Sequence, residues 1–318
     1  MIDKIYGFLA YIRRKLYKKN ILKQKKLPKP VISIGNLSVG GTGKTPITIS
    51  ISKYLKSKGL NVVVLSRGYK RKTKQTLIVS EEDKGYEIFG DEPYLMFKKG
   101  IPVVVSSSRY DAGILALEKL NPDIFILDDG FQHFQLYRDI DILVIDLNKP
   151  FWEDKLLPFG RLREPKSFYK YADLFLITKW KNKKEKLKKL KEFNKPYFLT
   201  EEKINRLTDF KKVYDFDILK DKKIIAFAGL GNNKYFFETV KNLAKEYNFK
   251  IEKFLDFPDH YNYKNFKKEE NKIYITTEKD LIKFKDKKNI YALEYQIEIP
   301  EDFKKYLDLK LNQILTKK

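Results

Sequence analysis

Short apolar runs rich in β-branched residues alternate along much of the chain with stretches that have helical spacing. The predicted strands are Val31–Ile34, Val62–Leu65, Val103–Val105, Ile124–Leu127, Ile142–Ile145 and Leu174–Ile177. The predicted helices between them lie near Pro46–Lys58, Glu92–Lys99 and Asp111–Leu120. Continuous apolar strands that alternate with helices are typical of a parallel sheet buried on both faces. Residues 30–200 are therefore predicted to form an α/β domain whose parallel sheet is sandwiched by helices.

A second, smaller α/β domain is expected over residues 222–318. Its predicted elements are a strand at Ile224–Ala228, a helix from about Lys234 to Glu246, and strands at Tyr274–Thr276 and Ile290–Glu294. Residues 201–221 show no strong periodicity and are interpreted as a connector between the two domains. Lysines dominate Lys179–Lys195, which is predicted to be a solvated helix.

Residues 1–29 form a separate segment, for which we predict an amphipathic helix. Its apolar positions recur at helical spacing with aromatic residues beside them: Ile5, Tyr6, Phe8, Leu9, Ile12, Leu16 and Tyr17. The first 30 residues contain ten Lys or Arg residues against one acid, Asp3. A stripe edged with cations suits an anionic membrane surface, but it also suits packing against the protein's own domain. The pattern alone leaves both interpretations open.

The composition narrows the possible classes of function. The chain has 318 residues, no Cys and a formal net charge of +24. The absence of Cys excludes disulfides, thiolate metal sites and a Cys nucleophile. The charge favours polyanionic partners, but the basic residues are dispersed and no nucleic-acid-binding module is recognisable, so we expect no nucleic-acid partner. No uncharged apolar run approaches the ~20 residues that span a bilayer, and no signal peptide is recognisable, so we expect the protein to stay in the cytoplasm, with or without attachment to a membrane surface. We also expect a monomer.

The strongest chemical signal is Ser38–Thr45, which follows one predicted strand and precedes a predicted helix. A phosphate-binding loop requires this context, because successive backbone N–H groups and the helix N-terminus then surround the phosphates. The expected nucleotide-binding residues are Ser38, Val39, Gly40, Gly41, Thr42, Gly43, Lys44 and Thr45. Lys44 is expected to neutralise the β- and γ-phosphates, and Thr45 to ligate Mg²⁺. Ser38 departs from the usual pattern, which has its first Gly at this position.

Two carboxylates complete the expected nucleotide site. Asp128 and Asp129 directly follow the apolar run Ile124–Leu127. An acidic residue at the end of a neighbouring strand is the part of a P-loop enzyme that holds the metal shell. The sequence therefore predicts a P-loop NTPase-type fold that uses ATP and Mg²⁺, and it leaves open which of the two Asp residues touches the metal.

Three polar clusters are candidates for the side that accepts the phosphate. They are Asp91 with Glu92, Asp259 with His260, and Arg163 with Glu164. Phosphoryl transfer to an alcohol needs a base near the hydroxyl proton and cations around the transferring group. Asp91 is the candidate base, and His260 could orient it or tune its pKa. Arg109 or Arg163 could complete the charge clamp. If His260 serves the site of the first domain, that site lies between the two domains.

Seven motifs, taken in order, resemble those of the tetraacyldisaccharide 4′-kinase family. They are SVGGTGKTP (38–46), SRGY (66–69), GDEP (90–93), DDGFQH (128–133), LREP (162–165), FPDH (257–260) and TEKD (277–280). The resemblance implies ATP- and Mg²⁺-dependent phosphorylation of the 4′-hydroxyl of tetraacyldisaccharide 1-phosphate, the lipid A precursor, to give lipid IVA. It also implies a peripheral enzyme on the cytoplasmic face of the bacterial inner membrane, attached through its N-terminal helix.

The resemblance also implies roles for individual residues. The catalytic residues would be Lys44, Asp91, Arg109, Arg163 and His260. The metal region would contain Thr45, Glu92, Asp128 and Asp129, and the substrate side Tyr69, Gln132, His133 and Glu164. Three positions depart from the family pattern, namely Lys70, Phe159 and Arg161, and they bear on substrate fit rather than on the reaction.

A regulatory P-loop ATPase or GTPase is the main alternative. Thr178 and Lys179 superficially resemble a guanine-reading motif, but Lys181 stands where that motif has its carboxylate. A switch protein would also have no need of Asp91 and His260 as a pair.

Overall fold

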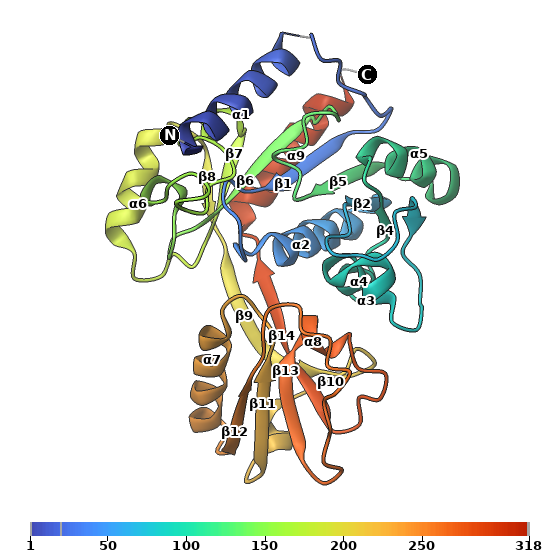
Figure 1. The fold of residues 1–318 in the computed structure, drawn as a ribbon, viewed down its shortest axis with the longest axis vertical. Coiled ribbons are helices and arrows are strands. Elements are labelled where there is room, and N and C mark those ends of the chain that lie inside the picture. Colours follow the sequence, from blue (N-terminus) through green and yellow to red (C-terminus); the bar gives the residue numbers. More distant parts are fainter. Residues whose placement is uncertain (1, 20, 317–318) are drawn as a thin grey trace.

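The computed structural model describes residues 2–19 and 21–316, and these form two α/β units stacked along the long axis of the molecule (Figure 1). Met1, Asn20 and residues 317–318 lie outside the described residues. Within the described part of the chain, no helix is long and apolar enough to cross a membrane.

The first unit is built on an eight-stranded sheet with the order β3–β4–β2–β5–β1–β6–β7–β8, in the described residues. All its neighbouring strands are parallel except β3, which runs antiparallel to β4. Its strands are β1 (Val31–Gly35), β2 (Val62–Ser66), β3 (Leu77–Ile78), β4 (Val103–Val105), β5 (Ile124–Asp128), β6 (Ile140–Asp146), β7 (Leu174–Thr178) and β8 (Tyr197–Leu199). The predicted α/β class is therefore confirmed, and all six predicted strands of this unit are present. Because β1 lies between β5 and β6, the loop after β1 begins beside the end of β5.

Helices cover both faces of this sheet. One apolar cluster joins the sheet to α2 (Lys44–Ser57), α4 (Asp91–Lys98) and α9 (Glu301–Leu315). On the opposite face pack α5 (Arg109–Leu120) and α6 (Lys184–Leu190), and Ala10 of α1 (Ile2–Lys18) contacts the cluster that includes α6. The short helix α3 (Gly85–Phe89) precedes α4.

Helix α6 is shorter than the helix predicted at Lys179–Lys195. Lys179 and Asn182 have φ values of 52° and 60°, which an α-helix cannot contain, so the helix begins only at Lys184. Leu190 is nevertheless fully buried, so this lysine-rich helix packs against the core through its apolar side.

The N-terminal helix is present, and its apolar residues divide between two environments. Leu16 and Tyr17 are half-buried against the first unit. Phe8, Tyr11 and Ile12 are 60%, 46% and 36% exposed. The side chains of Ile5, Tyr6 and Leu9, which belong to the predicted stripe, lie outside those that the structure describes. The helix therefore uses only part of its apolar surface for packing within the chain.

The second unit is built on a six-stranded sheet with the order β10–β9–β14–β13–β11–β12, again counting described residues. The strands are β9 (Glu201–Thr208), β10 (Val213–Tyr214), β11 (Lys223–Ala228), β12 (Lys250–Asp256), β13 (Ile273–Thr277) and β14 (Ile290–Glu298). Helix α7 (Asn233–Glu246) packs on β11 and β12, and the short helix α8 (Glu278–Leu281) follows β13.

Two predicted boundaries are wrong. Residues 201–221 are not a connector, because they contain β9, which pairs antiparallel with β14. Most side chains of β9 are polar and at least partly exposed, so the strand carries no apolar alternation to detect. The segment 222–318 does not belong wholly to the second unit, because its last helix, α9, packs on the first sheet and buries Phe303 and Leu307 there. Strands β9 and β14 thus form the ribbon that runs between the units (Figure 1).

Candidate active site

The loop between β1 and α2 has the backbone of a phosphate-binding loop. Gly40 and Gly43 have φ values of 105° and 89°, in the left-handed region that disfavours residues with a side chain. Helix α2 begins at Lys44, so Thr45 lies in its first turn and the N–H groups of that turn face the loop. The predicted strand–loop–helix context is therefore present.

Asn36 organises the inside of this loop. Its side-chain amide donates to Oγ1 of Thr42 over 2.9 Å, and its side-chain oxygen accepts from Nζ of Lys44 over 3.2 Å. Thr178, at the end of β7, donates to the carbonyl oxygen of Thr42 over 3.2 Å. The N–H of Val39 donates to the carbonyl of Arg161, which ties the loop to the segment before Arg163. Sequence reasoning missed Asn36, because an Asn before a glycine-rich loop resembles an ordinary turn residue.

Asp128 and Asp129 lie beside Lys44 as predicted. Nζ of Lys44 is 3.5 Å from Oδ1 of Asp129, and Ser66 Oγ donates to Oδ2 of Asp128 over 3.3 Å. Burial, reinforced by the charge of Asp129, raises the pKa of Asp128 to about 6. Burial also acts on Asp129, but the charges of Lys44 and Arg163 outweigh it and hold the pKa of Asp129 below its ordinary value.

Arg163 and Glu164 extend this cluster toward α1. Arg163 Nη1 donates to Oδ2 of Asp129 over 2.7 Å and to Oε1 of Gln132 over 3.2 Å. The amide of Gln132 donates in turn to Oε2 of Glu164 over 3.0 Å. Arg14 of α1 lies 3.7 Å from the same carboxylate oxygen, and both partners of this pair are almost completely buried. Glu164 therefore connects the nucleotide loop to the N-terminal helix.

Arg109 and His133 are close to the two Asp residues but make different contributions. Arg109 begins α5 and is 5% exposed, and burial lowers its pKa to about 10 although Asp128 opposes the shift. Its Nε has no hydrogen-bond partner among the described residues. Burial, together with the charges of Arg109 and Arg138, lowers the pKa of His133 to about 3, so this imidazole is neutral at physiological pH.

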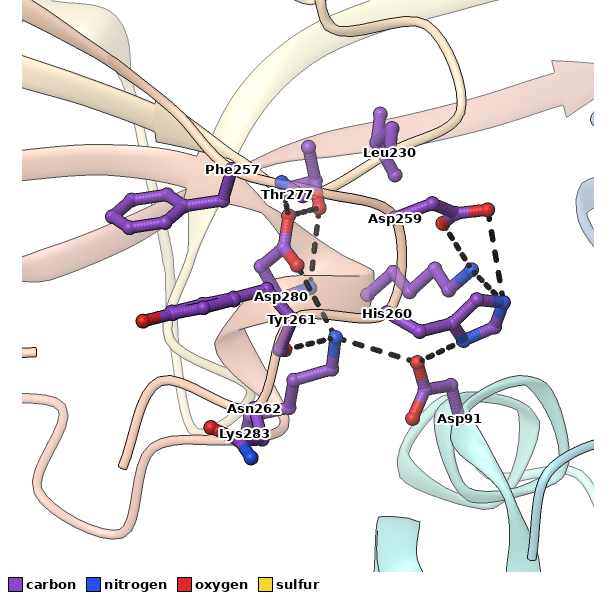
Figure 2. Close-up of polar contacts among 12 residues, drawn as sticks. Asp91, Leu230, Phe257, Asp259, His260, Tyr261, Asn262, Thr277, Asp280 and Lys283 are labelled. Carbon is purple, nitrogen blue, oxygen red and sulfur yellow. Dashed lines mark hydrogen bonds and ion pairs between the residues drawn. The ribbon is translucent and has the colours of Figure 1, made fainter. Parts of the chain in front are cut away.

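Asp91 and His260 meet across the two units. Asp91 is the first residue of α4, and His260 follows β12 in the second unit. Nδ1 of His260 lies 2.8 Å from Oδ2 of Asp91, although the two residues are 169 positions apart in the sequence (Figure 2). Burial acts to raise the pKa of Asp91, but the hydrogen bond from His260 and the charges of Lys283 and Lys279 outweigh it and lower that pKa. The predicted pairing of these two residues is therefore a contact of the structure.

Tyr69 and Glu92 lie at the edge of this contact. The ring centroid of Tyr69 is 5.7 Å from that of His260, and Tyr69 is 59% exposed. Nζ of Lys279 is 3.2 Å from Glu92 and 3.3 Å from Nε2 of His260. The sequence singled out TEKD only as a motif, so the positions of Lys279 and of Lys283 beside Asp91 are findings of the structure. The chain has 66 Lys or Arg residues, and nothing in the sequence distinguishes Lys279 and Lys283 from the others.

A phosphate-binding loop, two strand-end carboxylates and an Asp–His pair formed across the two units define a P-loop kinase. The family described as Tetraacyldisaccharide-1-P 4'-kinase (LpxK) matches residues 1–312. This chain belongs to that family.

Individual relatives cover nearly the whole chain. A tetraacyldisaccharide 4′-kinase of Aquifex aeolicus (strain VF5) is 46% identical over 308 residues, which cover 94% of this chain and 93% of the relative. One of Halothermothrix orenii is 36% identical, with 98% of this chain and 85% of the relative covered. A solved structure of LpxK from Aquifex aeolicus, described as an “apo” form in complex with ATP, superposes with a TM-score of 0.85 at 43% identity, covering 98% of this chain and 97% of that one.

Proposed function

We propose that this protein transfers the γ-phosphoryl group of ATP to the 4′-hydroxyl of tetraacyldisaccharide 1-phosphate, which yields the 4′-phosphorylated lipid A precursor. Family membership over residues 1–312 supports the reaction, and the contact between Asp91 and His260 across the two units is the observation that carries it. A similar solved structure described as a complex with ATP supports the choice of donor.

The residues around the loop fit the donor side of this reaction. Lys44 is held by Asn36 and Asp129, and this fixed ammonium supports its proposed role of binding the β- and γ-phosphates. Arg163, fixed on Asp129, and Arg109, whose Nε lacks a partner among the described residues, supply the further cations that the transferring group requires. We assign Ser38–Thr45 as the segment that binds the phosphates.

Mg²⁺ fits this site as well. Oδ1 of Asp128 is buried without a hydrogen-bond partner among the described residues, and Oδ1 of Asp129 has only the ion pair with Lys44. No three acidic or His residues of the described chain converge as a complete metal cage, which agrees with the preference of Mg²⁺ for one or two carboxylates plus phosphate and water oxygens. Asp128, Asp129 and Thr45 would hold the ion, with Glu92 at its edge. When bound, Mg²⁺ would offset the negative charge of the phosphates.

Asp91 is the proposed general base. Its carboxylate accepts the proton of the 4′-hydroxyl while that oxygen forms its bond to the γ-phosphorus and the bond to ADP breaks. The lowered pKa of Asp91 keeps the carboxylate ionised and able to accept the proton. We assign the orienting role to His260 and the acceptor side to Tyr69, Gln132, His133 and Glu164. We also propose that the enzyme acts as a monomer.

The exposed part of α1 supports attachment to the cytoplasmic face of the inner membrane, where a lipid substrate is available. Phe8 and Tyr11 are exposed on the same helix as Arg13 and Lys15, which are also exposed. Aromatic and aliphatic side chains edged with cations bind the interface of an anionic bilayer. Attachment would keep the protein peripheral and bring the site close to its substrate.

A phosphotransfer assay with ATP, Mg²⁺ and tetraacyldisaccharide 1-phosphate tests the proposal, with Lys44→Ala and Asp91→Ala as controls. We expect a phosphorylated disaccharide whose formation requires both residues. ATP turnover at the same rate with and without the lipid would instead support a regulatory P-loop switch. The described residues give no separate observation in favour of that alternative. Lys179, which belongs to the segment that resembles a guanine-reading motif, instead forms a 2.8 Å ion pair with Asp146.

A further inference from the structure

Lys283 is a buried lysine beside the proposed base. It follows α8 in the second unit, and its side chain is 1% exposed. A buried ammonium group is stable only when it is paired and hydrogen-bonded, and it has three N–H donors to satisfy. Its Nζ lies 2.9 Å from the carbonyl oxygen of Tyr261, 3.4 Å from Oδ1 of Asp280 and 3.3 Å from Oδ2 of Asp91 (Figure 2). The ammonium group therefore makes two hydrogen bonds within its own unit and an ion pair with Asp91.

Asp280 fixes this lysine within the second unit. It is completely buried, and its Oδ2 accepts from Oγ1 of Thr277 over 2.8 Å and from the N–H of Gly229 over 2.9 Å. The other oxygen, Oδ1, pairs with Lys283. Asp280 and the carbonyl of Tyr261 thus hold the ammonium group from its own unit, and its ion pair with Asp91 crosses the boundary.

Two groups of the second unit converge on one oxygen of Asp91. Both Nδ1 of His260 and Nζ of Lys283 contact Oδ2, while Oδ1 has no hydrogen-bond partner among the described residues. Figure 2 shows this second oxygen pointing away from both groups. A hydrogen bond and an ion pair on the same oxygen restrain the carboxylate better than the hydrogen bond alone, and they leave the other oxygen for a substrate hydroxyl.

Lys279 and Asp259 both lie beside the outer nitrogen of His260. Nζ of Lys279 is 3.3 Å from Nε2, and Oδ2 of Asp259 is 3.8 Å from the same nitrogen. The inner nitrogen, Nδ1, forms the 2.8 Å hydrogen bond with Oδ2 of Asp91. His260 thus contributes a hydrogen bond to this oxygen, and Lys283 contributes a positive charge beside it.

We propose that Lys283, held by Asp280, is a positioning residue for the base Asp91: it fixes the carboxylate through Oδ2 once the two units are together, so that Oδ1 faces the acceptor hydroxyl. This inference rests on the proposed kinase function and extends it to a residue that does not contact the substrate. Its consequence is that the first unit carries the base while the second unit orients it.

Steady-state phosphotransfer kinetics of Lys283→Met test this inference, with tetraacyldisaccharide 1-phosphate as acceptor. A misplaced base lowers the rate of the chemical step, so we expect kcat to fall about 10- to 100-fold while the KM for ATP changes less than about two-fold. Lys285→Met is the matched control. Lys285 is an exposed lysine that forms a 3.4 Å ion pair with Asp83 across the same boundary, and its loss should leave kcat unchanged.

A double-mutant cycle separates positioning from a general loss of structure. In the Asp91→Asn background, adding Lys283→Met should change kcat less than about two-fold, because the effect of the lysine acts through the carboxylate that is already gone. Equal loss in both backgrounds, or an unchanged kcat in the single variant, would overturn the inference. If Asp91→Asn itself retains full activity, the proposed base is wrong, which is a distinct result.

Removal of Lys283 leaves Asp280 buried with one partner fewer, so the single variant can lose stability. The double variant Asp280→Asn/Lys283→Met removes both charges and keeps polar atoms for Thr277 and Gly229. Replacement of both members of a buried pair is tolerated far better than removal of one. We expect it to fold and to show the same fall in kcat, and a folded double variant with wild-type kcat would refute the positioning role.

Discussion

Arg14 anchors the N-terminal helix to the site, and its replacement by Met tests how much that anchor contributes. The guanidinium is 5% exposed, and its carbon lies within 5.0 Å of four ring centroids. These rings belong to Phe131, Phe134, Phe168 and Tyr171. Burial lowers the pKa of Arg14 to about 10, so it stays charged at neutral pH opposite Glu164.

Removal of one partner of a buried ion pair costs about 3–5 kcal/mol, because the other charge stays buried without compensation. We therefore expect Arg14→Met to lower the free energy of unfolding by that amount in chemical denaturation at pH 8. Arg13 on the same helix is exposed and lies 6.0 Å from a single ring, so Arg13→Met should change stability by less than about 1 kcal/mol.

The pH dependence of stability in Arg14→Met should show that the loss of stability comes from the unpaired charge of Glu164. Burial already raises the pKa of Glu164 although Arg14 opposes the shift, and loss of Arg14 raises that pKa further. A raised pKa in the folded state means that the folded protein binds more protons, so stability falls as pH rises above the ordinary Glu value. Each further unit contributes about 1.4 kcal/mol. The loss should thus be larger at pH 8 than at pH 5, and Glu164→Gln should recover part of it. A loss of equal size at both pH values would refute this reasoning.

Four further predictions concern the reaction, the metal, the membrane and acid stability. Asp91→Asn should lower kcat about 10²- to 10⁴-fold at nearly constant KM for ATP in steady-state assays. Asp128→Asn should shift the Mg²⁺ concentration for half-maximal activity upward, which a Mg²⁺ titration of the rate measures. The double variant Phe8→Ser/Tyr11→Ser should bind liposomes about 10-fold or more weakly in flotation assays, with an unchanged melting temperature. Undiminished binding would contradict the proposed role of α1 at the membrane surface. Because the pKa of His133 is lowered to about 3, stability should fall by about 2 kcal/mol between pH 7 and pH 5, and His133→Gln should abolish that fall in urea unfolding.

The nucleotide half of the site was predictable from the sequence because its signals are local. The phosphate-binding loop and the pair Asp128–Asp129 each follow an apolar strand, and strand order then brings them together. Asn36 lies within the same segment but was missed, since its contacts with Thr42 and Lys44 depend on the folded loop.

The acceptor half was predictable only in part. Asp91 and His260 were identified as a pair through chemistry and family resemblance, and the hydrogen bond between them confirms the pairing as a contact. Lys279 and Lys283 were not identified, because a Lys in a basic chain gives no sign of burial. Their burial results from packing between α8 and the segment around Asp91, which no periodicity of the sequence encodes.

The boundaries predicted between the units are wrong for a related reason. Strand β9 is polar along most of its length, and α9 has the amphipathic pattern of any surface helix. Nothing in either pattern indicates which sheet the element joins. Their destinations are set by long-range pairing, as in the antiparallel contact of Ile297 with Glu202 between β14 and β9.

Strand β14 connects the donor and acceptor halves mechanically. Its residue Ile297 accepts a hydrogen bond from Ser50 of α2, and its side chain lies beside Gly43 of the phosphate-binding loop. The other end of β14 pairs with β13, whose last residue Thr277 holds Asp280 and thereby Lys283. The strand that packs beside the phosphate-binding loop is therefore also paired with the strand that supports Lys283, so β14 links the two sets of residues through continuous backbone.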